Sequence, residues 1–276
     1  MVSDGVAQQA AFRLVFVTAT RPSPLVKREP NMAVVSYDRA PYSVRRDLVD
    51  VHLRVWDHMA SPGTWLDGAK RIAVAAAARE ARTCRLCQLR KLSVSPNSQT
   101  GRHDDTSALP ADWVDIVHRI VTDPGRLTKG WFDRAVGKRI EDGTYVELVS
   151  IVAHVTAIDT FARGIGSDEW LLPTAQAGSP TRYRPREARL HDAWVPTIAW
   201  HERGPRESDY FHGPPANIKM ALTLVPDEAR SFFDLVGNQY LPGPAMRDFA
   251  NEFRAITHAQ IELIAGRVSA LNQCTY

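Results

Sequence analysis

The stretch from Gly143 to Phe161, GTYVELVSIVAHVTAIDTF, decides the fold class of this chain. Apolar side chains cover most of its helical surface, and they are Val146, Leu148, Val149, Ile151, Val152, Val155 and Ile158. A helix that is apolar over so broad a face must be largely buried by other elements. The sequence therefore predicts a long core helix over this stretch.

Outward from this stretch, apolar residues at three- and four-residue steps predict further helices. They are expected over residues 43–59, 65–82, 112–121, 218–224, 229–236, 246–253 and 258–271. The second of these has a small-residue face that lets another helix approach closely, formed by Ile72, Ala73, Ala76 and Ala77. Residues 93–107 read as a polar loop, and strand signals are nearly absent apart from 12–18. We therefore predict an all-α fold.

Three boundaries divide the chain in this prediction. Residues 166–190 are rich in Pro, Gly and Arg and lack periodicity, which is typical of a linker or a long crossing loop. We expect this segment to join two helical halves, 32–165 and 191–276. Residues 1–31 end in a proline-rich charged run and are expected to be a disordered arm, unless Met32 is the natural start.

Composition narrows the class of partner and the compartment. Lysine plus arginine (34) nearly equals aspartate plus glutamate (31), and no basic stripe is present, so nucleic acid is not an expected partner. No uninterrupted apolar run approaches the roughly 20 residues that span a membrane. Residues 10–19 contain Arg13 and follow Asp4, unlike a secretory signal, so we expect a cytoplasmic protein without a membrane partner. No Gly-rich phosphate loop follows a strand, and no cofactor is expected.

Cys84 and Cys87 form the Cys-x-x-Cys of this chain, which has three cysteines. That set is unlike the even, scattered cysteines of a disulfide-stapled secreted domain and favours redox or metal chemistry. Neighbouring cations stabilise thiolate, the species that attacks peroxides and disulfides. Here they are Arg82, Arg85, Arg90 and Lys91. In a redox protein the first cysteine would attack and the second would resolve.

Two other interpretations of this motif stay open. The cysteines are half of a structural zinc site if His103 and one more ligand complete it, although zinc sites usually use a second well-spaced pair and the sequence has none. The cysteines can also be inert packing residues. For a proton relay to the dithiol the candidates are Glu80, His103 and Glu147. Glu147 shares a helical face with His154, which makes the two a relay pair or a structural hydrogen bond.

The run from Thr257 to Tyr276, THAQIELIAGRVSALNQCTY, places Glu262 twelve residues before Cys274. It resembles the active-site helix of alkylhydroperoxidase D-like and carboxymuconolactone decarboxylase-like proteins, where a glutamate stands twelve residues before the first cysteine of Cys-x-x-Cys. The run from Gly63 to Cys87, GTWLDGAKRIAVAAAAREARTCRLC, resembles a second copy of it, offset by 190 positions. That copy keeps both cysteines, but Ile72 stands where the glutamate would be.

Residues 32–276 most resemble the alkylhydroperoxidase-related (seleno)proteins of this family. The resemblance implies a helical bundle, frequently oligomeric, and a thiol-dependent peroxidase or disulfide oxidoreductase acting on a small peroxide or a partner disulfide protein. It implies Cys84, Cys87, Cys274 and Glu262 as site residues. Tyr276 stands just before the second cysteine or selenocysteine of the motif, so we expect a UGA codon read as stop. The alternative class is a catalytically inactive helical interaction protein whose dithiol is structural or zinc-bound.

Overall fold

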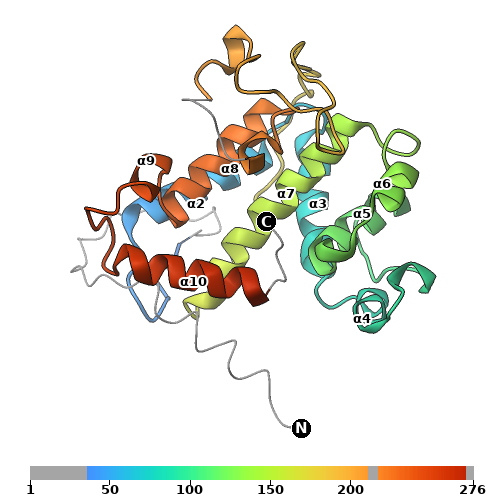
Figure 1. The fold of residues 1–276 in the computed structure, drawn as a ribbon. Helices are drawn as coiled ribbons and strands as arrows, with labels where there is room; N and C mark the ends of the chain where they lie inside the picture. Colours follow the sequence, from blue (N-terminus) through green and yellow to red (C-terminus); the bar gives the residue numbers. More distant parts are fainter. Residues whose placement is uncertain (1–35, 211–216, 272–276) are drawn as a thin grey trace. The chain divides into compact units, whose positions relative to one another are not determined.

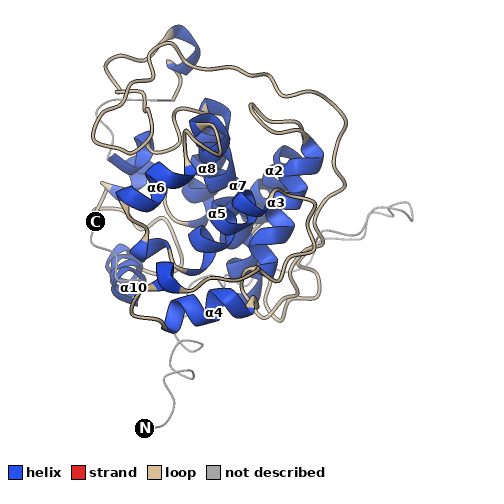
Figure 2. Ribbon diagram, turned by 90° about the vertical axis from the view of Figure 1, so that its right-hand side faces the viewer, coloured by secondary structure: helices blue, strands red, loops and turns tan. Residues whose placement is uncertain are grey.

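The computed structural model describes residues 36–210 and 217–271 (Figure 1). In these ranges the regular elements are helices, and the only β pairing is two isolated bridges. Figure 2 accordingly shows helices joined by loops. The α-helices are α2 (Arg46–Ala60), α3 (Gly68–Glu80), α4 (Arg85–Leu92), α5 (Ala111–Thr122), α6 (Lys129–Ala135), α7 (Asp142–Gly164), α8 (Pro226–Gln239), α9 (Gly243–Met246) and α10 (His258–Leu271). The all-α prediction is confirmed. The predicted arm over 1–31 and the strand signal over 12–18 lie outside the described residues.

Helix α7 is the predicted core helix. Six of its apolar side chains are at most 4% exposed, and they are Val146, Leu148, Ile151, Val152, Val155 and Ile158. By length and composition α7 is also apolar enough to cross a membrane, but 67% of the qualifying window is buried inside the protein. A core helix meets the same criteria. The cytoplasmic location and the absence of a membrane partner stay predictions.

The structure differs from the helix prediction in several places. Of the helix predicted over 246–253 only Met246 is helical, because the Asp248 carboxylate accepts hydrogen bonds from the Ala250 backbone N–H and the Asn251 side chain, which holds a turn. Residues 218–224 form only a short 3₁₀ helix, Asn217–Met220, followed by turns. Three described α-helices were not predicted, α4, α6 and α9. All are short and lack a long apolar repeat.

The buried face of α3 also differs from the predicted one. The buried face is still rich in small residues, but it shares only Ala77 with the predicted face and includes a buried arginine; its members are Gly68, Arg71, Val74, Ala75, Ala77 and Ala78. Arg71 is 1% exposed because it is paired with carboxylates of two other helices. Only the folded chain brings those partners together, so a local apolar pattern gives no sign of them.

The described residues fall into two compact units, each discontinuous along the chain. Within the described ranges, unit 1 comprises residues 36–54, 157–171 and 235–271, and unit 2 comprises 55–156, 172–210 and 217–234. Each unit therefore draws on both predicted halves, so the units do not coincide with them. The division into halves stays a prediction about sequence relatedness.

Unit 1 contains an aromatic cluster around Tyr37. Its hydroxyl lies 2.8 Å from Nδ1 of His52, and its ring contacts Phe161 and Trp170. A second small core joins Leu241 to Ile261 of α10.

In unit 2 part of the predicted linker is a crossing loop with fixed contacts. The backbone N–H groups of Gln176 and Arg182 each donate a hydrogen bond of 2.8 Å, to the carbonyls of Ala60 and Thr64 respectively.

The two similar sequence runs start their helices in the same register. Helix α3 begins at Gly68 and α10 at His258, which is the 190-residue offset of the sequence (258 − 68). The preceding residue caps each helix. The Asp67 carboxylate accepts from the Lys70 N–H at 2.8 Å, and the Thr257 hydroxyl accepts from the Gln260 N–H at 3.2 Å. The two runs therefore share their local helix-start structure.

Candidate metal centre

A tight turn after α3 brings Cys84 to the start of α4. Cys84 is extended (φ −62°, ψ 124°) and is the N-cap residue of this helix. The Asp104 carboxylate accepts a 2.8 Å hydrogen bond from the Arg85 N–H and so satisfies one free donor of the first turn. Cys87 follows within that turn. The two sulfurs therefore face the same side of the helix start, and both cysteines are buried, at 0% and 2% exposure.

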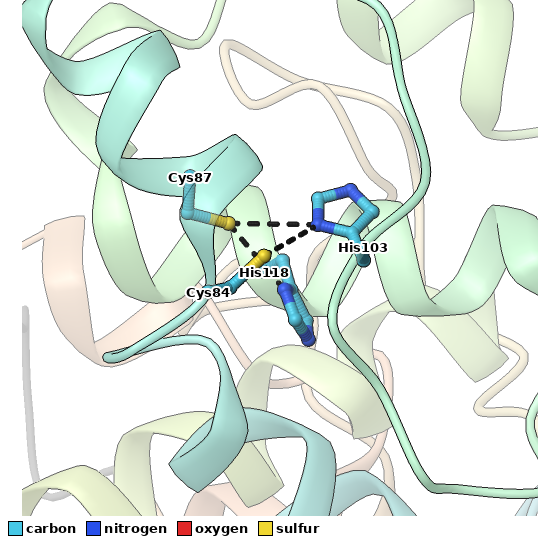
Figure 3. A group of neighbouring side chains, drawn as sticks. All are labelled: Cys84, Cys87, His103 and His118. Atoms are coloured by element: carbon cyan, nitrogen blue, oxygen red, sulfur yellow. Dashed lines mark hydrogen bonds between the residues drawn. The ribbon is translucent and has the colours of Figure 1, made fainter.

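Two histidines from other segments complete the group (Figure 3). His103 comes from the loop after α4, and its Nδ1 lies 3.5 Å from each sulfur. His118 comes from α5, and its Nδ1 lies 3.4 Å from Sγ of Cys87. All four ligand atoms lie within 4.8 Å of one another. The sequence analysis thus named three members of the group, Cys84, Cys87 and, in its zinc interpretation, His103. It missed His118.

The separations match the edges of a tetrahedral zinc site. Zn–S bonds of about 2.3 Å and Zn–N bonds of about 2.0–2.1 Å at tetrahedral angles place sulfur and nitrogen about 3.6 Å apart. Three of the four S···N separations are 3.4 to 3.5 Å, and all four ligand atoms lie within 4.8 Å of one another. Two thiolates and two imidazoles are a ligand set that structural zinc sites use. The four side chains therefore fit zinc in both chemistry and spacing.

An ion pair behind His103 orients its ring. Its Nε2–H donates to Oδ1 of Asp115 at 2.9 Å, and the same oxygen accepts from Arg90 Nη1 at 2.5 Å. Burial alone would lower the pKa of His103, but its hydrogen bonds to Asp115, Cys87 and Cys84 raise it to about 10, so the metal-free imidazole is protonated and zinc binding would displace the proton from Nδ1. Burial alone would raise the pKa of Asp115, but the hydrogen bonds from His103 and Arg90 lower it to about 2. A carboxylate behind a ligating imidazole is common in zinc sites.

The electrostatics around Cys84 favour its thiolate. Burial opposes ionisation of Cys84, yet backbone hydrogen bonds at Cys87 and Asp104, together with His103, lower the pKa of Cys84. Burial lowers the pKa of His118 to about 4, so this imidazole is neutral at physiological pH. Thiolate and neutral imidazole are the protonation states that bind metal, so Cys84 and His118 favour binding, whereas His103 must lose one proton on binding.

Around the cysteines the fold has little hydrophobic core. Leu86 is the only other member of the small buried cluster that contains the two cysteines. Helix α4 has eight residues, which is too short for stability on its own, and it leaves Leu89 and Leu92 exposed. A bound metal would supply the cross-link that burial does not supply here.

The other predicted site residues lie elsewhere or outside the description. Glu262 is exposed on α10, where it accepts a 2.5 Å hydrogen bond from the Tyr240 hydroxyl and faces His258 Nε2 at 3.4 Å. Cys274 lies outside the described residues. The roles predicted for both stay predictions.

Of the relay candidates, all of which lie in the described part of the chain, His103 is the one that contacts the sulfurs. Glu80 accepts from Thr106. Glu147 bonds Arg71 in a separate cluster. His154 donates from Nδ1 to the Ser150 carbonyl at 2.8 Å, so the histidine of the suggested Glu147–His154 pair has a structural partner of its own.

His118 carried a weak sequence signal. It lies among the apolar residues of α5, and it is fully buried with its Nε2 lacking a hydrogen-bond partner within the described ranges. A histidine on an apolar helix face is an ordinary core residue in most proteins. The spacing of 15 residues after His103 also follows no common zinc motif.

Comparison with known proteins gives no family assignment, because no family model, curated protein or solved structure matches the chain. The resemblance to alkylhydroperoxidase D-like proteins therefore stays a prediction.

Proposed function

We propose that this is a zinc-binding helical protein in which Cys84, Cys87, His103 and His118 hold one structural Zn²⁺. The observation that carries this proposal is the convergence of four ligand atoms within 4.8 Å of one another, three of the four residues being buried and three S···N separations matching the edge length of a zinc tetrahedron. Catalytic zinc keeps a position open for water, whereas four protein ligands close the coordination sphere. The centre is therefore structural in this proposal.

The role of the metal follows from the segments that its ligands come from. Cys84 and Cys87 fix the start of α4, His103 fixes the following loop, and His118 belongs to α5. Zinc bound to all four would hold α4 and the loop against α5. Because zinc binds the folded arrangement only, its binding free energy stabilises this part of unit 2.

Metal analysis of the purified full chain tests the proposal. We expect about one zinc per chain in the wild-type protein, and loss of that zinc in His118→Gln and Cys87→Ser. A suitable control is His191→Gln, because His191 is an exposed histidine of the same unit with a carboxylate 4.0 Å away. It should keep the metal. Zinc that is absent from the wild type after reconstitution, or retained fully by both ligand variants, would refute the site.

A second candidate function is thiol-disulfide redox chemistry, and one observation favours it specifically. Cys84, His103 and Asp115 form a chain of 3.5 Å and 2.9 Å contacts, the order in which an imidazole oriented by a carboxylate activates a thiol. In that function the dithiol and a peroxide ROOH give the Cys84–Cys87 disulfide, ROH and water. The burial of both sulfurs disfavours it, because the oxidant has to reach them.

The two functions separate in one experiment. Thiol alkylation is measured with and without a chelator, and peroxide consumption is followed with a thiol reductant present. Thiols that react only after chelation, together with no turnover, support the structural centre. Fast alkylation without chelator and sustained peroxide turnover support the redox function.

A further inference from the structure

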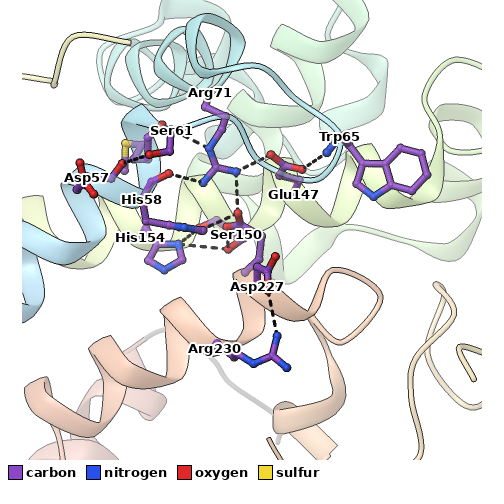
Figure 4. A network of polar contacts seen from close by, with 12 residues as sticks. Asp57, His58, Ser61, Trp65, Arg71, Glu147, Ser150, His154, Asp227 and Arg230 are labelled. Atoms are coloured by element: carbon purple, nitrogen blue, oxygen red, sulfur yellow. Dashed lines mark hydrogen bonds and ion pairs between the residues drawn. The ribbon is translucent and has the colours of Figure 1, made fainter. Parts of the chain in front are cut away.

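A second group of ionisable side chains is buried in unit 2, away from the cysteines (Figure 4). Arg71 of α3 lies between Glu147 of α7 and Glu228 of α8, and all three are at most 1% exposed. His58 of α2 and His154 of α7 adjoin them. The group therefore joins four helices through charge.

Hydrogen bonds link the members of this cluster into one network. Nη1 of Arg71 donates to Oε1 of Glu147 at 2.5 Å and to Oε1 of Glu228 at 2.6 Å. His58 Nε2 lies 2.8 Å from the same Glu228 oxygen. The other oxygens of the two carboxylates accept from the Trp65 N–H and the Ser150 hydroxyl, each at 2.7 Å. A change of protonation at one member therefore changes the electrostatic environment of the others.

Arg71 also satisfies the C-terminal end of α2. Its Nη2 donates to the His58 carbonyl at 3.2 Å, and its Nε donates to the Met59 carbonyl at 3.4 Å. A cation is favourable at that end of a helix dipole. The same guanidinium thus serves two carboxylates and the last turn of α2.

The formal charges of the cluster do not balance without one more proton. Arg71 contributes one positive charge, and Glu147 and Glu228 contribute one negative charge each when ionised. His154 supplies no charge near neutrality, because burial lowers its pKa to about 4. An uncompensated charge in a buried site is strongly unfavourable.

Two charged groups adjacent to cluster members along the chain are engaged elsewhere. On α2, Asp57 accepts from the Gln176 side chain at 2.8 Å. On α8, Asp227 accepts from Arg230 at 3.0 Å. Two positions in contact with the cluster's carboxylates remain as holders of the extra proton, the imidazole of His58 and the carboxyl of Glu147. Of the two, only His58 faces solvent, with 27% of its side chain exposed.

We propose that the cluster takes up one proton, shared between His58 and Glu147, and that loss of this proton as pH rises loosens the packing of α2, α3, α7 and α8 within unit 2. The cluster is then a pH-sensitive switch. In the protonated cluster, Arg71 and Glu228 form a neutral buried pair. Glu147 is then either neutral itself or balanced by the positive charge of His58. Deprotonated, it holds a buried net negative charge.

The two carboxylates respond to pH in opposite directions. Burial and the charge of Glu228 raise the pKa of Glu147, so its contribution to stability is present at low pH and is lost as pH rises through that raised value. Burial opposes ionisation of Glu228 too, but Arg71 and His58 hold its pKa well below the usual range. Its contribution is lost only in strong acid. Above strong acid the pH response of the two carboxylates therefore comes from Glu147, whose pKa is raised.

Chemical denaturation of the full chain at a series of pH values tests the switch. Glu147→Gln removes one negative charge, so the formal charges of the cluster in this variant balance without the extra proton. We expect the folding equilibrium constant of the wild type to fall relative to this variant as pH rises, by at most about tenfold per pH unit for one linked proton. His191→Gln is the control and should keep the wild-type profile. Parallel profiles for the wild type and Glu147→Gln would overturn the proposal.

If Glu147→Gln does not fold, the wild-type protein still decides the matter. Glutamate and histidine side chains labelled with ¹³C are then followed by NMR through the same pH series. A common titration at the His58 ring and a buried carboxyl supports one shared proton. A His58 titration that leaves the buried carboxyl signals unchanged contradicts it.

Discussion

Substitution of Asp115 gives the sharpest view of how the proposed zinc centre is supported. Asp115 is not a ligand, but its Oδ1 accepts from both His103 and Arg90. Loss of a carboxylate behind a ligating histidine weakens metal binding by about 10- to 100-fold. Because 37% of the Asp115 side chain is exposed, water replaces part of the lost interaction. We therefore expect Asp115→Ala to weaken zinc binding about tenfold, or about 1.4 kcal/mol.

Asp115→Asn should have a smaller effect. The amide oxygen can take the place of Oδ1 and keep both hydrogen bonds, but their charge assistance is lost. Hydrogen bonds to charged groups are about twice as strong as neutral ones, so about half of the free energy remains, and the loss is about threefold. The order wild type, Asn, Ala is part of the prediction.

Competition with a chelator of known zinc affinity measures these differences. Asp112→Ala is the matched control, because Asp112 is on the same helix and pairs with Arg139 at the surface. It should bind zinc as the wild type does. Equal affinities for Asp115→Ala and Asp112→Ala would show that Asp115 does not orient a zinc ligand, and the assignment of His103 would lose its main support.

Three further predictions concern stability. In equilibrium denaturation, the wild type with a chelator should have a free energy of unfolding about 2.7 kcal/mol lower than the wild type with free zinc at 100 times its Kd. The free energy of unfolding of Cys87→Ser should be the same in both conditions. Arg71→Met leaves the buried carboxylates of Glu147 and Glu228 without their cation and should lower the free energy of unfolding by about 3–5 kcal/mol. A thermal melt like that of the wild type would mean that the pair carries no buried charge. A Cβ on Gly63 would overlap the Glu147 carboxylate, so Gly63→Ala should lower the free energy of unfolding by about 1–3 kcal/mol. The control is Gly237→Ala in α8, whose Cβ would meet nothing within 4 Å and which should be neutral or stabilising in the same assay.

Much of the helical framework could be predicted because it depends on local apolar repeats. Helix α7 shows the broad apolar face of a core helix, and α10 starts and ends at the predicted residues. Helix α4 could not be predicted in this way. It buries only Leu86 and Cys87, so it has no apolar repeat to recognise.

The sites depend on contacts between distant residues, which the sequence does not reveal. Cys84 and Cys87 were evident from their spacing. His118 joins them only because α5 packs beside α4, 31 residues from Cys87 along the chain. Arg71 likewise meets Glu228 across 157 residues. In both cases the physical signal is a polar side chain buried on an apolar helix face, which becomes meaningful only when its partners are known.

X-ray absorption spectroscopy at the zinc edge tests the central claim most directly. For the purified full chain we predict a four-coordinate site with two sulfur ligands at about 2.3 Å and two nitrogen ligands at about 2.0–2.1 Å. In His118→Gln one nitrogen should be lost or replaced by oxygen, and in His191→Gln the spectrum should not change. A site without sulfur ligands, or with the same ligands in His118→Gln as in the wild type, would contradict the proposed centre.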